Sequence, residues 1–196
     1  MKKSWIIIIV VVVLVLIGYN YGKGKYNNMV VTSEQVDSQW AQVENVYQRR
    51  ADLIPNLVAT VKGYAAHEKE TLEGVVEARA KATSTTINAN DMDAAALQKF
   101  QAAQDGLSSA LSRLMVVVER YPDLKANQNF LQLQAQLEGT ENRITVERMR
   151  FNEAAQKYNL SIKVFPDNLF ANMFGFDEKA YFEAQQGADQ APKVEF

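Results

Sequence analysis

The chain of 196 residues contains no cysteine, one histidine, four prolines and nine glycines. Without cysteine there are no disulfides, no thiolate catalysis and no cysteine-ligated metal sites. The single His67 cannot supply the repeated Glu-x-x-His pairs that bind metals in helical bundles, so we expect no metal, cofactor or catalytic residues. Basic residues form no cluster and the formal net charge is −2, so nucleic acid is not an expected partner. The scarcity of proline and glycine favours long helices.

One long apolar run is present, at the amino end. Every residue from Trp5 to Ile17 is apolar. Residues 4–21 would form about 27 Å of helix at about 1.5 Å per residue, close to the roughly 30 Å of a bilayer's hydrocarbon core. Trp5 and two tyrosines flank the run, where aromatic rings favour the headgroup regions. We therefore predict a transmembrane anchor over residues 1–22, with the lipid bilayer as the partner of residues 4–21.

A cleaved secretory signal is the alternative, because an apolar core of about 7–15 residues also suits one. Bulky Tyr19 and Tyr21 stand where a cleavage site needs small residues, and no cysteine could carry a lipid on a cleaved form. An uncleaved anchor is therefore favoured. Two lysines and the α-amino group precede the run and two lysines follow it. The positive-inside rule then favours, by a small difference in charge, a cytoplasmic amino end with the rest outside the cytoplasm.

Residues 23–165 carry the pattern of long amphipathic helices. Apolar residues recur in alternating steps of three and four, which places them on one side of a helix. The first stripe runs from about residue 33 to 86, with Ser33 as its N-cap. It stays in phase across Pro55, which predicts one helix kinked at the proline or two nearly coaxial helices. The polar residues 83–90 predict a loop.

Two further stripes complete the pattern. Asp91 or Asp93 can cap the second, which ends at Tyr121-Pro122 because the residue before a proline avoids helix. The third runs over residues 130–162 and includes Ile144. With the first stripe broken at its proline, four helical rods result. The predicted fold is all-α: an N-terminal transmembrane helix followed by an antiparallel four-helix bundle of long helices.

Six positions of the stripes hold polar or charged residues: Arg50, Glu68, Arg79, Gln104, Glu141 and Arg148. A charge at an inward position is costly unless it is paired. We expect long stems to reach the rim, or opposite charges to pair between rods and fix their register. Glu141 and an arginine of the first rod are the candidate pair. The alternative is a polar interior that binds an ion or ligand.

Residues 166–196 form an aromatic-rich tail. Its candidate partner or oligomer surface comprises Phe170, Phe174, Phe176, Tyr181 and Phe182. Either this segment folds back and covers the end of the bundle, or part of it stays exposed as a docking site for a partner, a second copy or the membrane interface. The last ten residues are polar, and we expect them to be loose apart from Val194 and Phe196.

Several stretches together resemble the LemA family, from the anchor to the last residue. They are Tyr26-Asn27, Trp40, Arg49 to Val58, Val61 to Ala65, His67-Glu68, Ala78-Arg79, Tyr121 to Ala126, Phe130 with Leu133, Glu141 to Ile144, Arg150 to Asn152, Tyr158-Asn159, Phe165-Pro166 and Pro192 to Phe196. The resemblance implies a bacterial protein with a single-pass anchor in the inner (cytoplasmic) membrane and an antiparallel bundle of the bromodomain-like topology class. It implies no catalytic or binding residues, because the family's biochemical role is poorly defined.

Three classes of function compete on this sequence. The first is a non-enzymatic, membrane-anchored scaffold or adaptor of the cell envelope, which binds envelope proteins or itself. The second is an oligomeric membrane assembly or pore, which would need many copies because one span cannot enclose a path. The third is a hydrolase using interior carboxylates, although no nucleophile–base set, phosphate loop or metal cluster is recognisable. The first class is the prediction, with a protein partner or homo-oligomer expected.

Overall fold

The computed structural model describes residues 3–87 and 92–183. Over these residues all regular structure is helical, which confirms the all-α prediction. The elements are α1 (Lys3–Tyr64), α2 (Lys69–Ser84), α3 (Ala94–Val118), α4 (Pro122–Lys125), α5 (Gln128–Lys163) and α6 (Asp167–Phe174).

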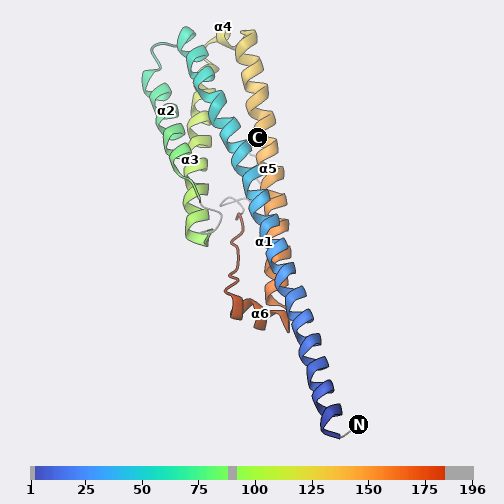
Figure 1. Cartoon of the computed structure of the whole chain (residues 1–196). Coiled ribbons are helices and arrows are strands. Elements are labelled where there is room, and N and C mark those ends of the chain that lie inside the picture. Colours follow the sequence, from blue (N-terminus) through green and yellow to red (C-terminus); the bar gives the residue numbers. More distant parts are fainter. Residues whose placement is uncertain (1–2, 88–91, 184–196) are drawn as a thin grey trace, which may run out of the picture.

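The helices α1, α2, α3 and α5 pack side by side, and the amino-terminal part of α1 extends beyond them as a single helix (Figure 1). α1 lies along α5, α2 lies along α3, and α1 also contacts α2. The short α4 joins α3 to α5 at the end of the bundle farthest from the amino terminus. α1 extends well beyond the bundle at the other end, and α6 lies against it where α5 finishes. The apolar run at the amino end is therefore part of one of the helices that pack together.

α1 differs from the prediction at both ends of its bundle portion. It is continuous over 62 residues, so Ser33 lies inside the helix and is not an N-cap. Pro55 also lies inside it, and the helix ends only after Tyr64. The chain reverses over residues 65–68, and α2 returns alongside α1 instead of continuing it. The prediction of one helix or two nearly coaxial helices over residues 33–86 is wrong. The apolar stripe stays in phase through residues 65–68, although the chain reverses its direction there.

The other boundaries follow local capping chemistry. Asp93 accepts a hydrogen bond from the Ala96 N–H at 2.7 Å and caps α3, whereas Asp91 lies outside the described residues. α2 ends at Ser84, so the predicted loop begins two residues later than expected. Tyr121-Pro122 ends the second stripe as predicted, with the proline in the first turn of α4. The polar tail after residue 183, with Val194 and Phe196, also lies outside the described residues.

The core consists of two clusters stacked along the bundle. The cluster nearer the anchor contains Met29, Val36, Trp40, Val43, Tyr47, Phe100, Ile144, Phe151, Tyr158 and Phe182. The farther one contains Ile54, Leu57, Val61, Leu107, Leu114, Leu124, Phe130 and Leu137. On α1 the first cluster ends at Tyr47 and the second begins at Ile54, so Arg50 lies between them. The predicted stripe through Leu137 and Ile144 is therefore core.

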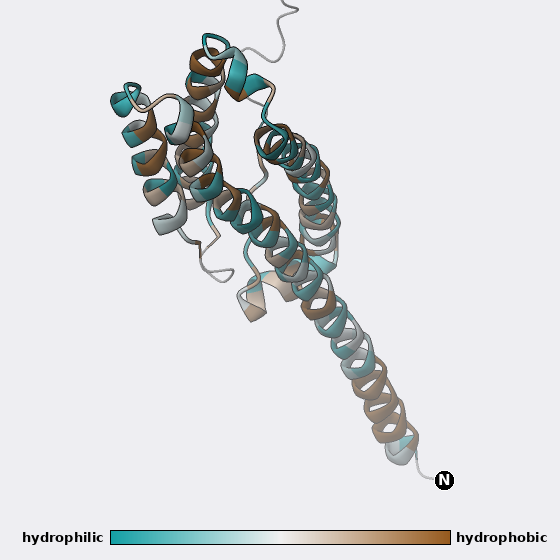
Figure 2. Ribbon diagram, turned by 90° about the horizontal axis from the view of Figure 1, so that it is seen from above, coloured by the Kyte–Doolittle hydropathy of each residue, from teal (hydrophilic) through white to brown (hydrophobic). Residues whose placement is uncertain are grey.

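Within the described residues, α1 is the one helix long and apolar enough to cross a membrane. Its most apolar window is entirely exposed, unlike the core helix of a soluble domain. Figure 2 shows an unbroken apolar stretch near the free end of the rod, whereas apolar and polar residues alternate along the bundle helices.

Candidate functional site

Arg50 is the largest charged group inside the bundle. Its side chain is 2% exposed, and its Nη1 donates to Glu141 Oε2 at 2.9 Å and to Ser108 Oγ at 3.0 Å. Its Nη2 donates to Gln104 Oε1 at 2.6 Å. One guanidinium thus ties α1 to α3 and α5, and it forms the ion pair that the sequence suggested between Glu141 and an arginine of the first rod. A planar, multiply donating group suits this task, because a lysine could not reach three acceptors in a fixed fork.

Gln104 extends this network to α2. Its Nε2 donates to the Ala82 carbonyl at 3.3 Å, while its Oε1 accepts from Arg50. The glutamine is buried, so both halves of its amide need partners and both have one. All four long helices are therefore linked at one level by Arg50 and Gln104. This arrangement fixes the register of the bundle without leaving Gln104 free for a ligand.

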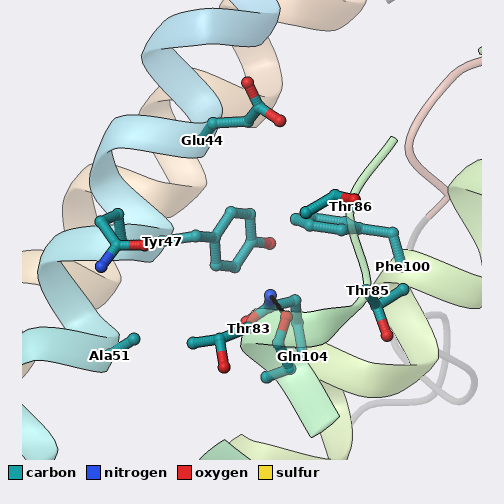
Figure 3. A pocket seen from close by; sticks show the side chains of 10 residues that line it. Glu44, Tyr47, Ala51, Thr83, Thr85, Thr86, Phe100 and Gln104 are labelled. Atoms are coloured by element: carbon teal, nitrogen blue, oxygen red, sulfur yellow. Dashed lines mark hydrogen bonds between the residues drawn. The ribbon is translucent and has the colours of Figure 1, made fainter. Parts of the chain in front are cut away.

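A small pocket opens beside the network (Figure 3). Tyr47 reaches from α1 toward Phe100 and Gln104, with ring centroids of Tyr47 and Phe100 5.1 Å apart. The pocket volume is ≈ 80 Å³, well below the roughly 300–1,000 Å³ of typical ligand sites. Burial raises the pKa values of Tyr47 and of Glu44 at its rim. The pocket has room for water and offers no paired nucleophile and base among its lining residues.

A larger hollow of ≈ 390 Å³ lies between α1, α5 and the segment after α6. Tyr158 lines it, and its hydroxyl donates to the Asp177 carbonyl at 2.8 Å. Burial, together with the charges of Asp177 and Asp37, raises the pKa of Tyr158 to about 12. The hydroxyl therefore stays protonated at neutral pH and acts as a donor. Among the residues that the structure describes, no group of three or more His, Asp or Glu side chains could hold a metal ion.

Arg79 has a structural task that follows from Pro55. A helical proline has no N–H, so the carbonyl four residues earlier, that of Ala51, loses its donor. Arg79 on α2 supplies one, because its Nε donates to the Ala51 carbonyl at 2.7 Å. Ala51 is buried, so water could not easily replace this donor. This contact lets α1 pass through the proline without ending.

We expect Arg79→Met to lower the free energy of unfolding by about 1–2 kcal/mol, because the Ala51 carbonyl loses its donor. Adding Pro55→Ala restores a backbone N–H at that carbonyl, so the cost of Arg79→Met should fall by about 1 kcal/mol in the double variant. Urea unfolding of the four proteins in a double-mutant cycle measures this coupling. Arg113→Met, at an exposed arginine of α3, is the matched control. Additive effects of the two substitutions would contradict the assignment.

The remaining polar candidates lie at the surface of the bundle. Glu141 has a side chain 55% exposed, so it is not an interior residue, and Arg50 reaches outward to it. Glu68 lies at the reversal between α1 and α2, where Arg120 Nη2 donates to it at 3.1 Å and Tyr121 Oη at 2.9 Å. The hydrogen bond to Glu68 raises the pKa of Tyr121. The predicted polar interior is therefore confined to Arg50 and Gln104.

The sixth polar candidate, Arg148, belongs to the tail contact. Its guanidinium lies 4.6 Å from the centre of the Phe182 ring, and its Nη2 donates to the Glu183 carbonyl at 2.9 Å. Phe182 is 6% exposed and packs against Trp40 and Phe151. Phe182 is therefore core and does not belong to the predicted docking surface, because the segment after α6 folds back into the bundle.

The other tail aromatics divide between core and surface. Phe176 is half-buried and its ring lies 5.6 Å from Tyr26. Phe170 is half-buried against Tyr21, with ring centroids 6.1 Å apart. Phe174 and Tyr181 remain 48% and 42% exposed, respectively. The segment therefore covers one side of the bundle, and part of its aromatic surface stays exposed.

Two asparagines on α5 hold the returning segment, and the sequence analysis missed their role. Asn152 donates to the Phe182 carbonyl at 3.0 Å and accepts from its N–H at 2.9 Å. Asn159 makes the same pair of bonds to Lys179, at 2.8 and 2.9 Å. Seven helical residues span about 10.5 Å, and three extended residues span about 10 Å, so the spacings match. In the sequence, the feature that could have indicated this role is the spacing of the two asparagines, which are seven residues apart on one helix.

We expect Asn159→Asp to lower the free energy of unfolding by about 3 kcal/mol. The change removes the donor to the Lys179 carbonyl and puts a charged carboxylate oxygen against that carbonyl, in a site where Asn159 is 2% exposed. A urea melt measures the loss, and hydrogen exchange should show faster exchange of the Lys179 amide. Asn142→Asp, at an exposed site on the same helix, should stay within about 0.5 kcal/mol of the unchanged protein. Equal effects of the two changes would contradict the clamp.

Known proteins resemble this chain over most of its length. The family model described as "LemA family" matches residues 39–196. Magnetosome protein MamQ 2 of Paramagnetospirillum magneticum is 28% identical over 182 residues, covering 84% of this chain and 67% of that protein. Magnetosome protein MamQ of Magnetospirillum gryphiswaldense is 26% identical with the same coverage. Protein LemA of Metamycoplasma hominis is 23% identical over 163 residues, covering 83% and 71%. The match over residues 39–196 covers the last part of α1 and the whole of α2, α3 and α5, and the chain belongs to the LemA family.

Proposed function

We propose that this protein is a non-enzymatic scaffold of the bacterial cell envelope that binds envelope proteins or a second copy of itself. Residues 4–21 hold it in the cytoplasmic membrane as a single span, and the bundle lies outside the cytoplasm. One observation carries the proposal: α1 runs without a break from an exposed apolar stretch into the core of the bundle.

The residues that follow the span support an uncleaved anchor. Lys25 Nζ lies 2.9 Å from Asp167 Oδ2, and the Asp167 side chain is 7% exposed. Tyr21 packs against Phe170 of α6. A signal sequence would be cut near this point, and cleavage would remove contacts that are built into the folded domain.

The unbroken helix also supports a mechanical role. α1 becomes buried in the bundle at Met29, twelve residues after Ile17, which is about 18 Å of helix. A flexible linker would let the domain swing freely, whereas a continuous helix holds it at a set height and angle. A scaffold that must present a surface to neighbours at one height benefits from this stiffness.

The interior offers little to an enzyme. The buried guanidinium and amide of Arg50 and Gln104 bond to protein groups. The pocket beside them is too small for an ordinary substrate. These features support binding through the outer surface over catalysis inside.

Carbonate extraction and thiol labelling test whether the protein is anchored in the membrane and on which side of it the bundle lies. Because the chain contains no cysteine, Val116→Cys introduces one thiol on the exposed face of α3. The protein should stay in membranes through alkaline carbonate, and an impermeant maleimide should label it in cells whose cytoplasmic membrane is intact. If the thiol is labelled only after the cells are lysed, the bundle lies in the cytoplasm and the proposed orientation is wrong.

Crosslinking tests the scaffold. A lysine-reactive crosslinker applied to native membranes should convert the tagged protein into discrete heavier species containing a second copy or a defined envelope protein. The same tag on an unrelated single-span anchor is the control. A protein that remains monomeric at native abundance would contradict the proposal.

A further inference from the structure

α6 carries apolar side chains that no other part of the described chain covers. Leu169 and Met173 are four residues apart in α6, so they share one side of the helix, and Phe165 lies in the turn just before it. Phe165, Leu169 and Met173 are 81%, 59% and 66% exposed, respectively. The opposite side of α6 is buried through Asp167 and Ala171. Clustered exposed apolar side chains of this size mark a contact surface.

α6 is seated on α1 just past the end of the apolar run. A Cβ at Gly22 would lie 3.1 Å from Phe170 Cε1, so the two helices approach closely at this glycine. Lys25 and Asp167 form an ion pair across the same junction at 2.9 Å. Farther along, Tyr26 packs edge-on against Phe174, with centroids 4.9 Å apart. These contacts fix the height of α6 along the rod.

That height coincides with the headgroup layer of a membrane crossed by the apolar run. With the span ending at Tyr21, the contacts of α6 at Gly22 and Tyr26 lie about 1.5 Å and 7.5 Å beyond it along the helix. Headgroups extend the bilayer from about 30 Å to about 40–45 Å, or roughly 5–8 Å on each side. Amphipathic helices bury their apolar face about 5–10 Å into this boundary. α6 therefore lies where such a helix would bind, as its position between bundle and bare rod shows in Figure 1.

We propose that Leu169 and Met173 of α6, with Phe165 in the turn before it, form a second membrane contact, which inserts into the lipid headgroup layer on the side of the bundle. The inference rests on the anchor of the proposed function. The occupant is lipid because the face is level with the headgroups, so any other partner would have to displace them. A second contact beside the span restrains the rod from tilting and sets the bundle at one orientation to the membrane surface.

The test uses the full chain in vesicles of phosphatidylethanolamine and phosphatidylglycerol. Separate Leu169→Cys and Met173→Cys variants receive an environment-sensitive fluorophore. A label at Val11→Cys serves as the reference for a position within the membrane span. A label at Val116→Cys, at an exposed valine of the bundle, serves as the reference for a position in water. Brominated lipids quench labels in the bilayer, and iodide quenches labels in water. We expect brominated lipids to quench the two α6 labels at least twice as strongly as the Val116→Cys label, and iodide to show the reverse order.

Each other outcome overturns a distinct claim. If the Val11→Cys label is quenched by brominated lipids while the α6 labels are open to iodide, the α6 contact is wrong and the anchor stands. If the α6 labels are protected from both quenchers, protein covers the face and the lipid assignment is wrong. If the Val11→Cys label is not quenched by brominated lipids, the anchor itself fails.

Discussion

Replacing Ile144 with aspartate will unfold the bundle. Ile144 lies in the core cluster nearer the anchor and is 3% exposed. The substitution removes a buried side chain, worth about 2–5 kcal/mol, and adds a carboxylate with no partner at several kcal/mol more. A domain has only about 5–15 kcal/mol of stability in total. We therefore expect the cooperative thermal transition to be lost. Near-ultraviolet circular dichroism is the suitable measurement, because it reports side-chain packing, whereas an inserted anchor would remain helical even if the bundle unfolds.

The matched control for this substitution is two residues away on the same helix. Val146→Asp changes a valine that is 39% exposed, so its carboxylate reaches water and the melting temperature should shift by only a few degrees. If the two variants melt alike, the side of α5 that faces the core has been assigned wrongly.

Placing arginines at Val11 and Leu14 will release the protein from the membrane. Both residues lie in the exposed apolar run, at 52% and 62% exposure. A charge at the centre of a span costs about 2.5–3.5 kcal/mol on insertion scales, so two cost about 5–7 kcal/mol. The bundle should still fold, because no core residue changes. Carbonate extraction followed by limited proteolysis distinguishes a released, folded protein from an aggregated one.

Arginines at Asn27 and Glu34 serve as the control, since both lie on exposed positions of α1 beyond the predicted span. That variant should stay in the membrane fraction. An arginine pair at Val11 and Leu14 that leaves the protein resistant to carbonate would show that the apolar run is not what holds it there.

The sequence predicted those features that depend on periodicity and composition. The apolar run, the stripe through Leu137 and Ile144, and the cap at Asp93 each depend on neighbours within a few residues. Such local patterns are readable in one chain because helix geometry fixes which residues share a side.

The errors arose where a distant residue decides the outcome. The first rod was expected to continue past Pro55 to about residue 86, but α1 ends at Tyr64 and α2 returns beside it, so that Arg79 of α2 donates to the carbonyl that Pro55 leaves without a donor. Glu141 was placed inside because it is in phase with the stripe, yet the long Arg50 side chain reaches out to meet it. Phe182 and Phe174 look alike in sequence. They differ in their contacts with distant residues: Asn152 bonds the backbone of Phe182, whose ring packs on Trp40 and Phe151.

The central claim is that one continuous helix joins the membrane to the core of the bundle. Spin labels at Val13→Cys and Gln42→Cys, in a chain without other cysteines, are 29 residues apart. A continuous helix places them about 44 Å apart at about 1.5 Å per residue. Pulsed electron–electron double resonance on the protein in vesicles should give a single narrow distribution near that distance. A broad or much shorter distribution, or a mature protein that lacks the first label because its amino end has been removed, would contradict the account.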